Sequence, residues 1–443
     1  MFKKVLFLAA YFLAPALLIA AIYASNPGYY GSSGFLPMVL GATAYTLLNA
    51  QLILSARPKW AEAYFGLDRF YRFHGLAAIF AITAAFAHKL LEGRIFPESL
   101  QTNLGDLAVA LFIGAAVLAL LFMADTPSRL LPPLRRLRAL LTRLKIGKYN
   151  VQIVLHNVNV AAVALVFVHV MLTSSARNPL AAALYILYFG ASMGFYLYHK
   201  AARPYFGGKR MIVEEVIEES PSMTTLVLRP QSGTVFPYLP GQFGFLRVSP
   251  HRIFSEEHPF SISSQPLDRE RLTMTIKNLG DWTSGVRKIQ TGSKATLDAP
   301  YGRFSPRLFD CRDGMVLIAG GVGITPMLSI LRYYAQADPS RKIVLLWGVS
   351  RRDELIRLPE LRQMQSSMQR FTFVPVANDP DFEGQKGYIT QQVIERTLAA
   401  QGYDRQKLHY FFCGPAPMWA SVRTSLKGMR IKSGRIHTER FAL

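Results

Sequence analysis

Two stretches of this sequence decide its fold: HGLAAIFAITAAFAH at residues 74–88 and HNVNVAAVALVFVH at residues 156–169. Each begins and ends with a histidine, and the residues between are almost entirely apolar. Apolar runs of this length suit helices that cross a bilayer, where ionisable side chains are rare and mark functional sites. Both stretches therefore predict a membrane-spanning helix with one histidine toward each end.

The spacing of the four histidines predicts two pairs at two depths. His74 and His88 are fourteen residues apart, which is nearly four helical turns, so they share a helix face. His156 and His169 are thirteen residues apart and lie well out of line in an ideal helix, so we expect a locally over- or under-wound turn between them. His74 and His156 then share one level, and His88 and His169 share a second level about 20 Å away.

The first half of the chain is built mainly from such apolar runs. Hydrophobic residues make up 51% of the chain, and nearly all long apolar runs lie before about residue 200. The first run follows Lys3 and Lys4 and resembles a signal peptide, but its length favours a span. We expect six spans, at residues 5–23, 35–56, 73–91, 105–124, 151–172 and 179–199.

Basic residues flank one side of these spans. The formal net charge is +22, and Lys and Arg gather at alternate span ends, most densely between the fourth and fifth spans. Positive charge in short loops marks the cytoplasmic side, so the N-terminus and the whole second half are expected in the cytoplasm. A basic chain can bind nucleic acid, but charges beside apolar spans favour membrane lipid, and we expect no nucleic-acid partner. The sequence predicts an integral protein of a bacterial-type plasma membrane.

Four neutral imidazoles at two levels of one helical bundle suit two b-type haems, each held by two histidines. The four histidines are therefore the predicted metal ligands. One alternative is that they are hydrogen-bonded core residues, which the matched pairs disfavour. Zinc is another, disfavoured because the pairs lack Cys or carboxylate neighbours. An iron–sulfur cluster on four cysteines is excluded, because the chain has only Cys311 and Cys413.

The sequence from about residue 211 to 305 consists of short alternating strands, which predict a small antiparallel β-barrel. Within it lies His258-Pro259-Phe260-Ser261, an aromatic ring beside hydroxyl groups that can stack on a flavin and hydrogen-bond its edge. The turn Gly280-Asp281-Trp282-Thr283 follows, where a glycine lets the backbone approach a pyrophosphate.

Residues from about 313 onward alternate strands and helices, which predicts an α/β nucleotide-binding domain. Ligands of such folds bind at the carboxyl ends of the strands, and three motifs lie there. The first opens a helix, where Thr325 can cap and Pro326 suits the first turn, leaving free N–H groups for a diphosphate. The three motifs are Gly320, Gly321, Gly323, Thr325 and Pro326; then Ser350, Arg351 and Arg352; then Cys413, Gly414 and Pro415.

These patterns predict a multidomain membrane protein with four segments. They are a six-helix transmembrane haem bundle at 1–200, a linker at 201–210, an FAD-binding β-barrel at 211–312 and an NADPH-binding α/β domain at 313–443.

With these motifs in place, the second half resembles the ferredoxin–NADP reductase superfamily. Together with the six spans and the histidine pairs, nearly the whole chain resembles a NADPH oxidase of the ferric-reductase-like group, in a compact form. The resemblance implies NADPH as hydride donor, FAD as the converter to single electrons, and two haems that pass them to oxygen, giving superoxide.

The resemblance also implies roles for single residues. Phe260 is expected on the isoalloxazine ring and Ser261 near its reactive nitrogen, while Cys413 is expected under the nicotinamide. Relatives often end with an aromatic ring over the flavin, and Phe441 is the candidate here. The remaining residues implied in FAD binding are His258, Pro259, Gly280, Trp282 and Thr283. Those implied in NADPH binding are Gly320, Gly321, Gly323, Thr325, Pro326, Ser350, Arg351, Arg352, Gly414 and Pro415.

Two departures from the animal oxidases concern the electron acceptor. Glu92 stands where those enzymes carry an additional outer histidine, and the second span has no arginine. A transmembrane ferric reductase, acting on a ferric chelate, and a module that feeds an extracytoplasmic partner are therefore alternatives. A transporter with a nucleotide-sensing domain is disfavoured, because the spans are neither repeated nor discontinuous. No EF-hand loop is present, so calcium control is not expected, and no obligatory protein partner is evident.

Overall fold

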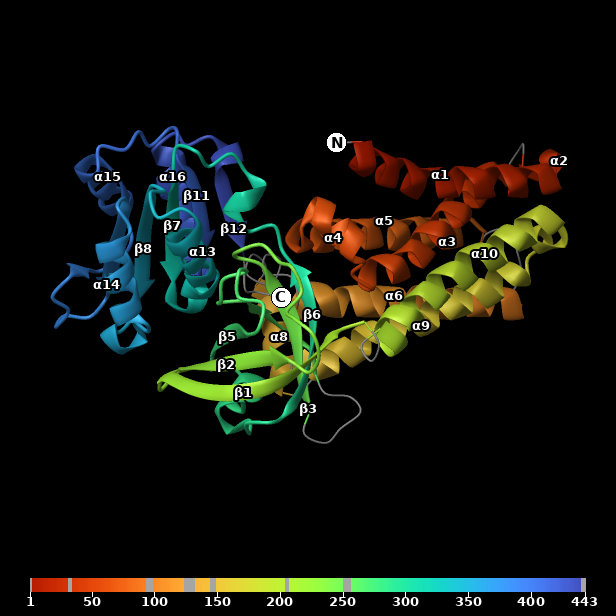
Figure 1. Cartoon of the computed structure of the whole chain (residues 1–443). Coiled ribbons are helices and arrows are strands. Elements are labelled where there is room, and N and C mark those ends of the chain that lie inside the picture. The colour runs from red at the N-terminus through yellow and green to blue at the C-terminus, as the bar shows by residue number, and fades with distance from the viewer. Residues whose placement is uncertain are drawn as a thin grey trace. The chain divides into compact units, whose positions relative to one another are not determined.

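The protein divides into two compact units, Met1–Arg203 and Pro204–Leu443, and each is described by itself. The structure is a computed structural model that describes residues 2–30, 34–92, 99–122, 132–143, 149–203, 207–249 and 256–439. Among these residues the first unit is helical and the second holds two sheets (Figure 1).

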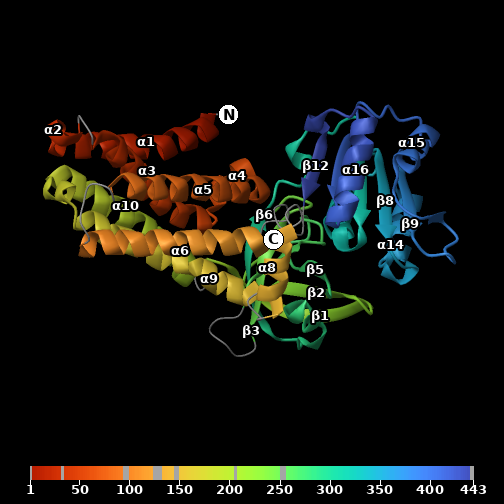
Figure 2. The same ribbon diagram turned by 180° about the vertical axis from the view of Figure 1, so that it is seen from behind.

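The first unit consists of long apolar helices that lie side by side (Figures 1 and 2). Five helices are long and apolar enough to cross a membrane, and the apolar segment Tyr11–Ser25 is shorter. Six membrane crossings therefore remain a prediction. The long helices are α1 (Phe2–Ser25), α3 (Phe35–Ser55), α5 (Leu67–Glu92), α6 (Leu100–Phe122), α9 (Tyr149–Met171) and α10 (Pro179–Leu197), which continues as a π-helix over Tyr198–Ala202.

Several polar side chains inside this bundle are hydrogen-bonded between helices, which lowers the cost of burying them in an apolar environment. The Tyr45 hydroxyl on α3 donates to the Tyr185 carbonyl on α10 at 2.6 Å. The Ser192 hydroxyl on α10 donates to Asn49 Oδ1 on α3 at 2.9 Å, and both side chains are buried. Such bonds join helices between which apolar surface alone gives little specificity.

Shorter helices that the apolar pattern did not predict connect the long ones. The most polar is α8, a basic amphipathic helix in which Leu140 is 54% exposed. A basic amphipathic helix with an exposed apolar face is typical of a membrane interface. The short helices are α2 (Pro27–Tyr30), α4 (Lys59–Phe65) and α8 (Pro132–Arg143), with a 3₁₀ turn at Ser174–Arg177.

The second unit begins with a six-stranded antiparallel sheet in the order β4-β3-β6-β1-β2-β5. The sheet curls into a half-barrel, because the segment after β4 reaches β5, where the Ser263 N–H donates to the Thr273 carbonyl at 2.8 Å. Alternating side chains point inward and form the barrel core. The strands are β1 (Lys209–Ser220), β2 (Met223–Pro230), β3 (Phe243–Ser249), β4 (His258–Ser261), β5 (Leu272–Lys277) and β6 (Lys294–Tyr301), with helix α12 (Asp281–Ser284) after β5.

A six-stranded parallel sheet follows, in the order β10-β9-β8-β7-β11-β12. Its central strand β7 (Met315–Gly320) is fully buried, as expected for a sheet covered on both faces. Because later strands add on both sides of β7, the strand order reverses between β7 and β11. The other elements are α13 (Ile324–Ala337), β8 (Ile343–Val349), α14 (Leu358–Ser367), β9 (Phe371–Ala377), β10 (Gln385–Lys386), α15 (Gln391–Ala400), β11 (His409–Cys413), α16 (Ala416–Gly428) and β12 (Ile436–Glu439).

The linker predicted at residues 201–210 is shorter in the structure. The helix that continues α10 extends into its first residues, and β1 already begins at Lys209. The reason is that Lys209 to Ile212 pair with β6, an interaction that the local sequence pattern does not reveal.

A stacked histidine pair lies at one edge of the parallel sheet. His409 on β11 and His437 on β12 lie 2.9 Å apart between Nδ1 and Nε2, and Phe309 stacks on the His437 ring at a centroid distance of 3.7 Å. Burial, followed by the neighbouring His409, lowers the pKa of His437 to about 3. Burial and then the charge of Arg435 lower the pKa of His409.

This pair predicts that the second unit loses stability in acid. Between pH 6.5 and about 3 the unfolded chain binds a proton on His437 that the folded chain does not, so stability falls as the pH drops through this window. The loss approaches about 1.4 kcal/mol per pH unit for this one group. The unfolding temperature at pH 7.5 and at pH 5 measures this loss. We expect the difference between the two unfolding temperatures to be smaller in His437→Phe than in the wild type. An equal difference in both proteins would contradict the assignment.

Candidate functional site

The structure brings the four intramembrane histidines together as two facing pairs. The His74 and His156 ring centroids are 6.4 Å apart with an interplanar angle of 66°. The His88 and His169 centroids are also 6.4 Å apart, at 82°. The pairs connect α5 with α9, although α5 packs mainly on α3 and α9 mainly on α6. Each histidine pair therefore joins the α3–α5 helix pair to the α6–α9 helix pair.

The change of winding expected in the fifth span is not present. The helix α9 is continuous and α-helical from Tyr149 to Met171, so no over- or under-wound turn separates His156 from His169. Because the backbone is regular, the imidazole rotamers and the crossing of the helices take up the angular difference. The expectation was wrong because it took the direction of each Cα around the helix axis as the direction of the imidazole ring. The side chain is long enough for the ring to lie away from that direction.

The spacing within each pair fits a metal held between two imidazoles. Two metal–nitrogen bonds of about 2.0–2.1 Å on opposite sides of one ion place the ring centroids about 6 Å apart. We call His74 and His156 the inner pair and His88 and His169 the outer pair, after the predicted topology. In the outer pair the backbone carbonyls of Pro37 and Gln101 lie 2.9 and 2.8 Å from Nδ1 of His88 and His169. A carbonyl only accepts, so Nδ1 donates and Nε2 keeps its lone pair for a metal. The donor set therefore fits a haem at each level.

Two rings of the predicted flavin motif lie against a third ring from the glycine turn. His258 and Phe260 alternate on β4 with Pro259 and Ser261, and both rings lie against Trp282, at centroid distances of 4.4 and 5.4 Å. The Ser261 hydroxyl is buried and has no hydrogen-bond partner among the described residues. A buried donor of this kind fits a ligand that supplies the acceptor, as the edge of a flavin would.

The glycine turn next to these rings has its backbone held by one side chain. The Thr283 hydroxyl accepts from the N–H groups of Leu279 and Gly280, at 2.9 Å each, and donates to the Gly280 carbonyl at 3.0 Å. A side chain at Gly280 would meet nothing within 4 Å, so the space above it is open. The turn is thus fixed in shape and accessible.

Two of the three strand-end motifs are in direct contact. The loop Gly320–Gly323 follows β7, and Cys413 and Gly414 end β11, its neighbour in the sheet. A Cβ at Gly323 would overlap the Cys413 carbonyl, and one at Gly414 would lie 3.2 Å from Gly320 Cα. The glycines are therefore required for this contact, at the point where the strand order reverses and nucleotides bind in such sheets.

The role predicted for Thr325 as a helix cap is wrong. The helix α13 begins at Ile324, its N-cap is Gly323, and no side chain caps it. Thr325 lies inside the first turn, where its hydroxyl donates to the Val322 carbonyl at 3.0 Å. Pro326 lies in the first turn, as predicted. Gly323 supplies no capping side chain, and the first amide of α13, that of Ile324, already donates to the Gly321 and Val322 carbonyls of the preceding 3₁₀ turn.

The third motif lies at the end of β8. The Arg351 guanidinium pairs with Asp353, and its side chain is 72% exposed. The Ser350 N–H donates to Glu354 Oε2 at 3.2 Å, and the Arg352 N–H to Asp379 at 3.4 Å. The cationic side chains are available at the surface, although carboxylates surround their backbone. Phe441 lies outside the described residues.

Contacts between the two sheets were not predicted from the sequence. Lys277 at the end of β5 binds Glu354 at 2.6 Å, and Arg357 binds Glu219 on β1. Within the α/β domain, Trp347, fully buried on β8, donates from its indole to the Gly321 carbonyl at 2.9 Å. Ion pairs between distant segments leave no local signal, whereas a tryptophan in a central strand could have been noticed as needing an acceptor.

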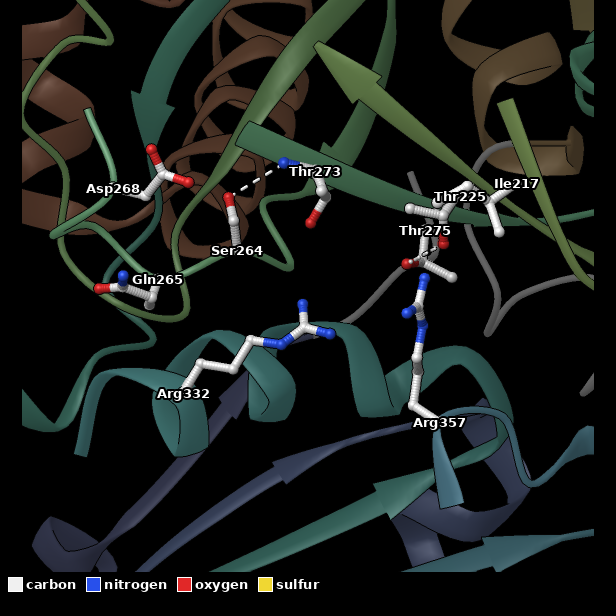
Figure 3. A pocket seen from close by; sticks show the side chains of 9 residues that line it. All are labelled: Ile217, Thr225, Ser264, Gln265, Asp268, Thr273, Thr275, Arg332 and Arg357. Carbon is white, nitrogen blue, oxygen red and sulfur yellow. Dashed lines mark hydrogen bonds between the residues drawn. The ribbon is translucent and has the colours of Figure 1, made fainter. Parts of the chain in front are cut away.

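A cavity of about 300 Å³ lies between the half-barrel and the α/β domain (Figure 3). Hydroxyl groups of β2 and β5 line one side, and two arginines line the other. Neither arginine is free, because Arg332 binds Glu360 and the Ser263 carbonyl, and Arg357 binds Glu219. None of the predicted site residues lines this cavity. It is lined by Ile217, Thr225, Ser264, Gln265, Asp268, Thr273, Thr275, Arg332 and Arg357.

Comparisons with known proteins match the second half of the chain. Residues 216–312 match the family model of an FAD-binding domain, and residues 317–424 match that of the oxidoreductase NAD-binding domain. The chain is 30% identical over 224 residues to the electron transfer component of 2-halobenzoate 1,2-dioxygenase from Burkholderia cepacia, covering 49% of this chain and 62% of that protein. It is 30% identical over 254 residues to the flavohemoprotein of Rhizobium meliloti, covering 53% and 60%.

A solved structure of the flavohem-like FAD/NAD-binding domain of nitric oxide dioxygenase from Vibrio cholerae covers 53% of this chain and 98% of its own, at 24% identity and a TM-score of 0.47. The chain spans less than two thirds of the length of the two relatives named above. The predicted order of a flavin domain followed by a nucleotide domain is confirmed. The second half of this chain carries an FAD-binding domain and an oxidoreductase NAD-binding domain, the two parts of a ferredoxin–NADP reductase-type dehydrogenase module.

Proposed function

We propose that this protein is a transmembrane oxidoreductase that passes electrons from NADPH through FAD and two b-type haems to oxygen, producing superoxide. The observation that carries the proposal is the two facing histidine pairs at 6.4 Å, in apolar helices of a chain that also carries an FAD- and NAD-binding module. A module of this kind releases electrons, and haems held by the histidine pairs would accept them within the same chain.

In the dehydrogenase half, each motif has a part in bringing the nicotinamide to the flavin. The glycine loop between β7 and the N-terminus of α13 would hold the diphosphate. Cys413 would lie under the nicotinamide, while Phe260 would stack on the isoalloxazine and the Ser261 hydroxyl would bond its reactive edge. FAD accepts a hydride and releases single electrons, which suits one-electron acceptors. Phe441 would cover the flavin until the nicotinamide displaces it.

In the helical half, His74 and His156 would hold the inner haem and His88 and His169 the outer haem, through Nε2 in the outer pair. Haem supplies one-electron transfer at these two levels. The five apolar helices and the basic amphipathic helix α8 support a membrane setting with the dehydrogenase half on the cytoplasmic side.

Oxygen is the acceptor that the resemblance favours. If His88 and His169 both hold the iron at the outer level, an acceptor would take its electron without binding the iron. A ferric chelate could use the same route, and Glu92 at the end of α5 favours a cationic acceptor more than a histidine would. The relative from Burkholderia cepacia is the electron transfer component of a dioxygenase, and a protein acceptor outside the membrane is the remaining alternative for this chain.

The outer haem is tested by His169→Ala. This variant is expected to hold one haem where the wild type holds two, to lose superoxide production, and to keep the reduction of FAD by NADPH. His199→Ala is the control, because His199 lies in the same unit but bonds only the Phe195 carbonyl in its own helix. Haem content, stopped-flow flavin reduction and a superoxide-dismutase-sensitive assay measure the three quantities. Two haems in His169→Ala would show that this histidine is not a ligand.

The nucleotide loop is tested by Gly323→Ala. The added Cβ overlaps the Cys413 carbonyl and must push the loop away from β11. We expect kcat/KM for NADPH to fall at least about tenfold, equivalent to about 1.4 kcal/mol, while FAD content stays constant. Gly348→Ala on the adjacent strand is the control, because its Cβ would make only ordinary contacts from 3.4 Å. Equal kcat/KM for NADPH in Gly323→Ala and Gly348→Ala would show that this loop does not bind NADPH.

The preference for NADPH over NADH is tested at Arg351. Its exposed pair with Asp353 is weak, so the guanidinium can turn to a 2′-phosphate. Arg351→Ala should lower the ratio of kcat/KM for NADPH to that for NADH by about tenfold. Arg312→Ala is a matched control, since Arg312 is also exposed and also pairs with an aspartate two residues away. A ratio that stays constant in Arg351→Ala would refute the role.

A further inference from the structure

The outer histidine pair is held by backbone groups of two other helices. Nδ1 of His88 lies 2.9 Å from the Pro37 carbonyl on α3, and Nδ1 of His169 lies 2.8 Å from the Gln101 carbonyl on α6. Both bonds require the proton on Nδ1, because a carbonyl cannot donate. The two histidines therefore share one tautomer and one kind of partner, on unrelated helices.

A glycine stands four residues after each of these carbonyls. A Cβ at Gly41 would lie 3.0 Å from His88 Nδ1 and Cε1, and a Cβ at Gly105 would lie 2.9 Å from His169 Nδ1. In an α-helix, residue i+4 lies directly over the carbonyl of residue i. Any side chain at either position would therefore push the imidazole away from its carbonyl.

The inner pair has no such arrangement. Nδ1 of His74 and Nδ1 of His156 are buried, and neither has a hydrogen-bond partner among the described residues. Gly75, which follows His74, has nothing within 4 Å of the position of a Cβ. The carbonyl-and-glycine arrangement thus distinguishes the outer level from the inner one.

We propose that Pro37 with Gly41, and Gln101 with Gly105, are matched positioning elements that fix the tautomer and ring plane of the two outer haem ligands. The inference rests on the proposed haem binding. A histidine ligand that donates its second N–H is a stronger donor to the metal, and second-shell bonds of this kind tune reduction potentials. The clamp therefore stabilises ferric iron at the outer level and holds the two imidazole planes near perpendicular, at 82°.

The test compares Gly105→Ala with Gly114→Ala in the full-length protein. Both glycines lie on α6, but a Cβ at Gly114 would meet nothing within 4 Å. In Gly105→Ala we expect either loss of the outer haem or a higher reduction potential and an altered low-spin ferric EPR signal for that haem alone. Gly114→Ala should match the wild type in haem content, potentiometric titration and EPR spectrum. Gly41→Ala should reproduce the effect from the other side.

Haem content tests haem binding, whereas the potentials and EPR signals test the positioning of the outer ligands. A wild-type protein without haem would refute the proposed function. Two haems with identical potentials and EPR signals in Gly105→Ala, Gly41→Ala and wild type would overturn the clamp while leaving haem binding intact. The wild type gives a further check that needs no variant, because near-perpendicular imidazole planes produce a strongly anisotropic low-spin ferric signal. Outer-haem signals typical of parallel planes would also overturn the inference.

Discussion

The structure of the helical half depends on placing four imidazoles in an apolar bundle at fixed separations. An apolar environment leaves polar groups without water, so every ring nitrogen needs a protein partner or a ligand. Nδ1 of each outer ring lies beside a backbone carbonyl, whereas Nδ1 of each inner ring has no hydrogen-bond partner among the described residues. Both pairs join α5 to α9 at a centroid distance of 6.4 Å, although the two helices pack mainly on different neighbours.

The dehydrogenase half is governed by a different constraint, the close approach of two backbone segments. Gly320 and Gly323 contact Cys413 and Gly414 because β7 and β11 are adjacent and their carboxyl ends meet where the strand order reverses. The same geometry leaves α13 without a capping side chain and places the end of β8 on the other side of β7. Ion pairs such as Lys277 with Glu354 then connect the half-barrel to the nucleotide domain within one compact unit.

Much of this arrangement could be predicted from periodicity and turn chemistry. The apolar runs matched the long helices, alternating residues matched the barrel strands, and buried runs ending in glycine matched β7 and β11, because each pattern reflects one local period. The helices α4 and α8 were missed because their sequences are short or basic. The ion pairs between the sheets and the carbonyl partners of His88 and His169 depend on contacts between distant segments, whereas the position of Thr325 depends on where the first turn of α13 begins. Gly41 and Gly105 were visible in the sequence, but their meaning required the imidazoles beside them.

We propose that electrons from a nicotinamide cofactor reach both histidine pairs through the flavin. An anaerobic titration of the purified full-length protein with NADPH tests it most directly, because flavin and haem absorb at different wavelengths. We expect flavin bleaching to be followed by the bands of two reduced b-type haems, with four electrons taken up per chain if FAD accepts two and each haem one. Flavin that bleaches fully while no haem spectrum is present, or while bound haem stays oxidised, would contradict it.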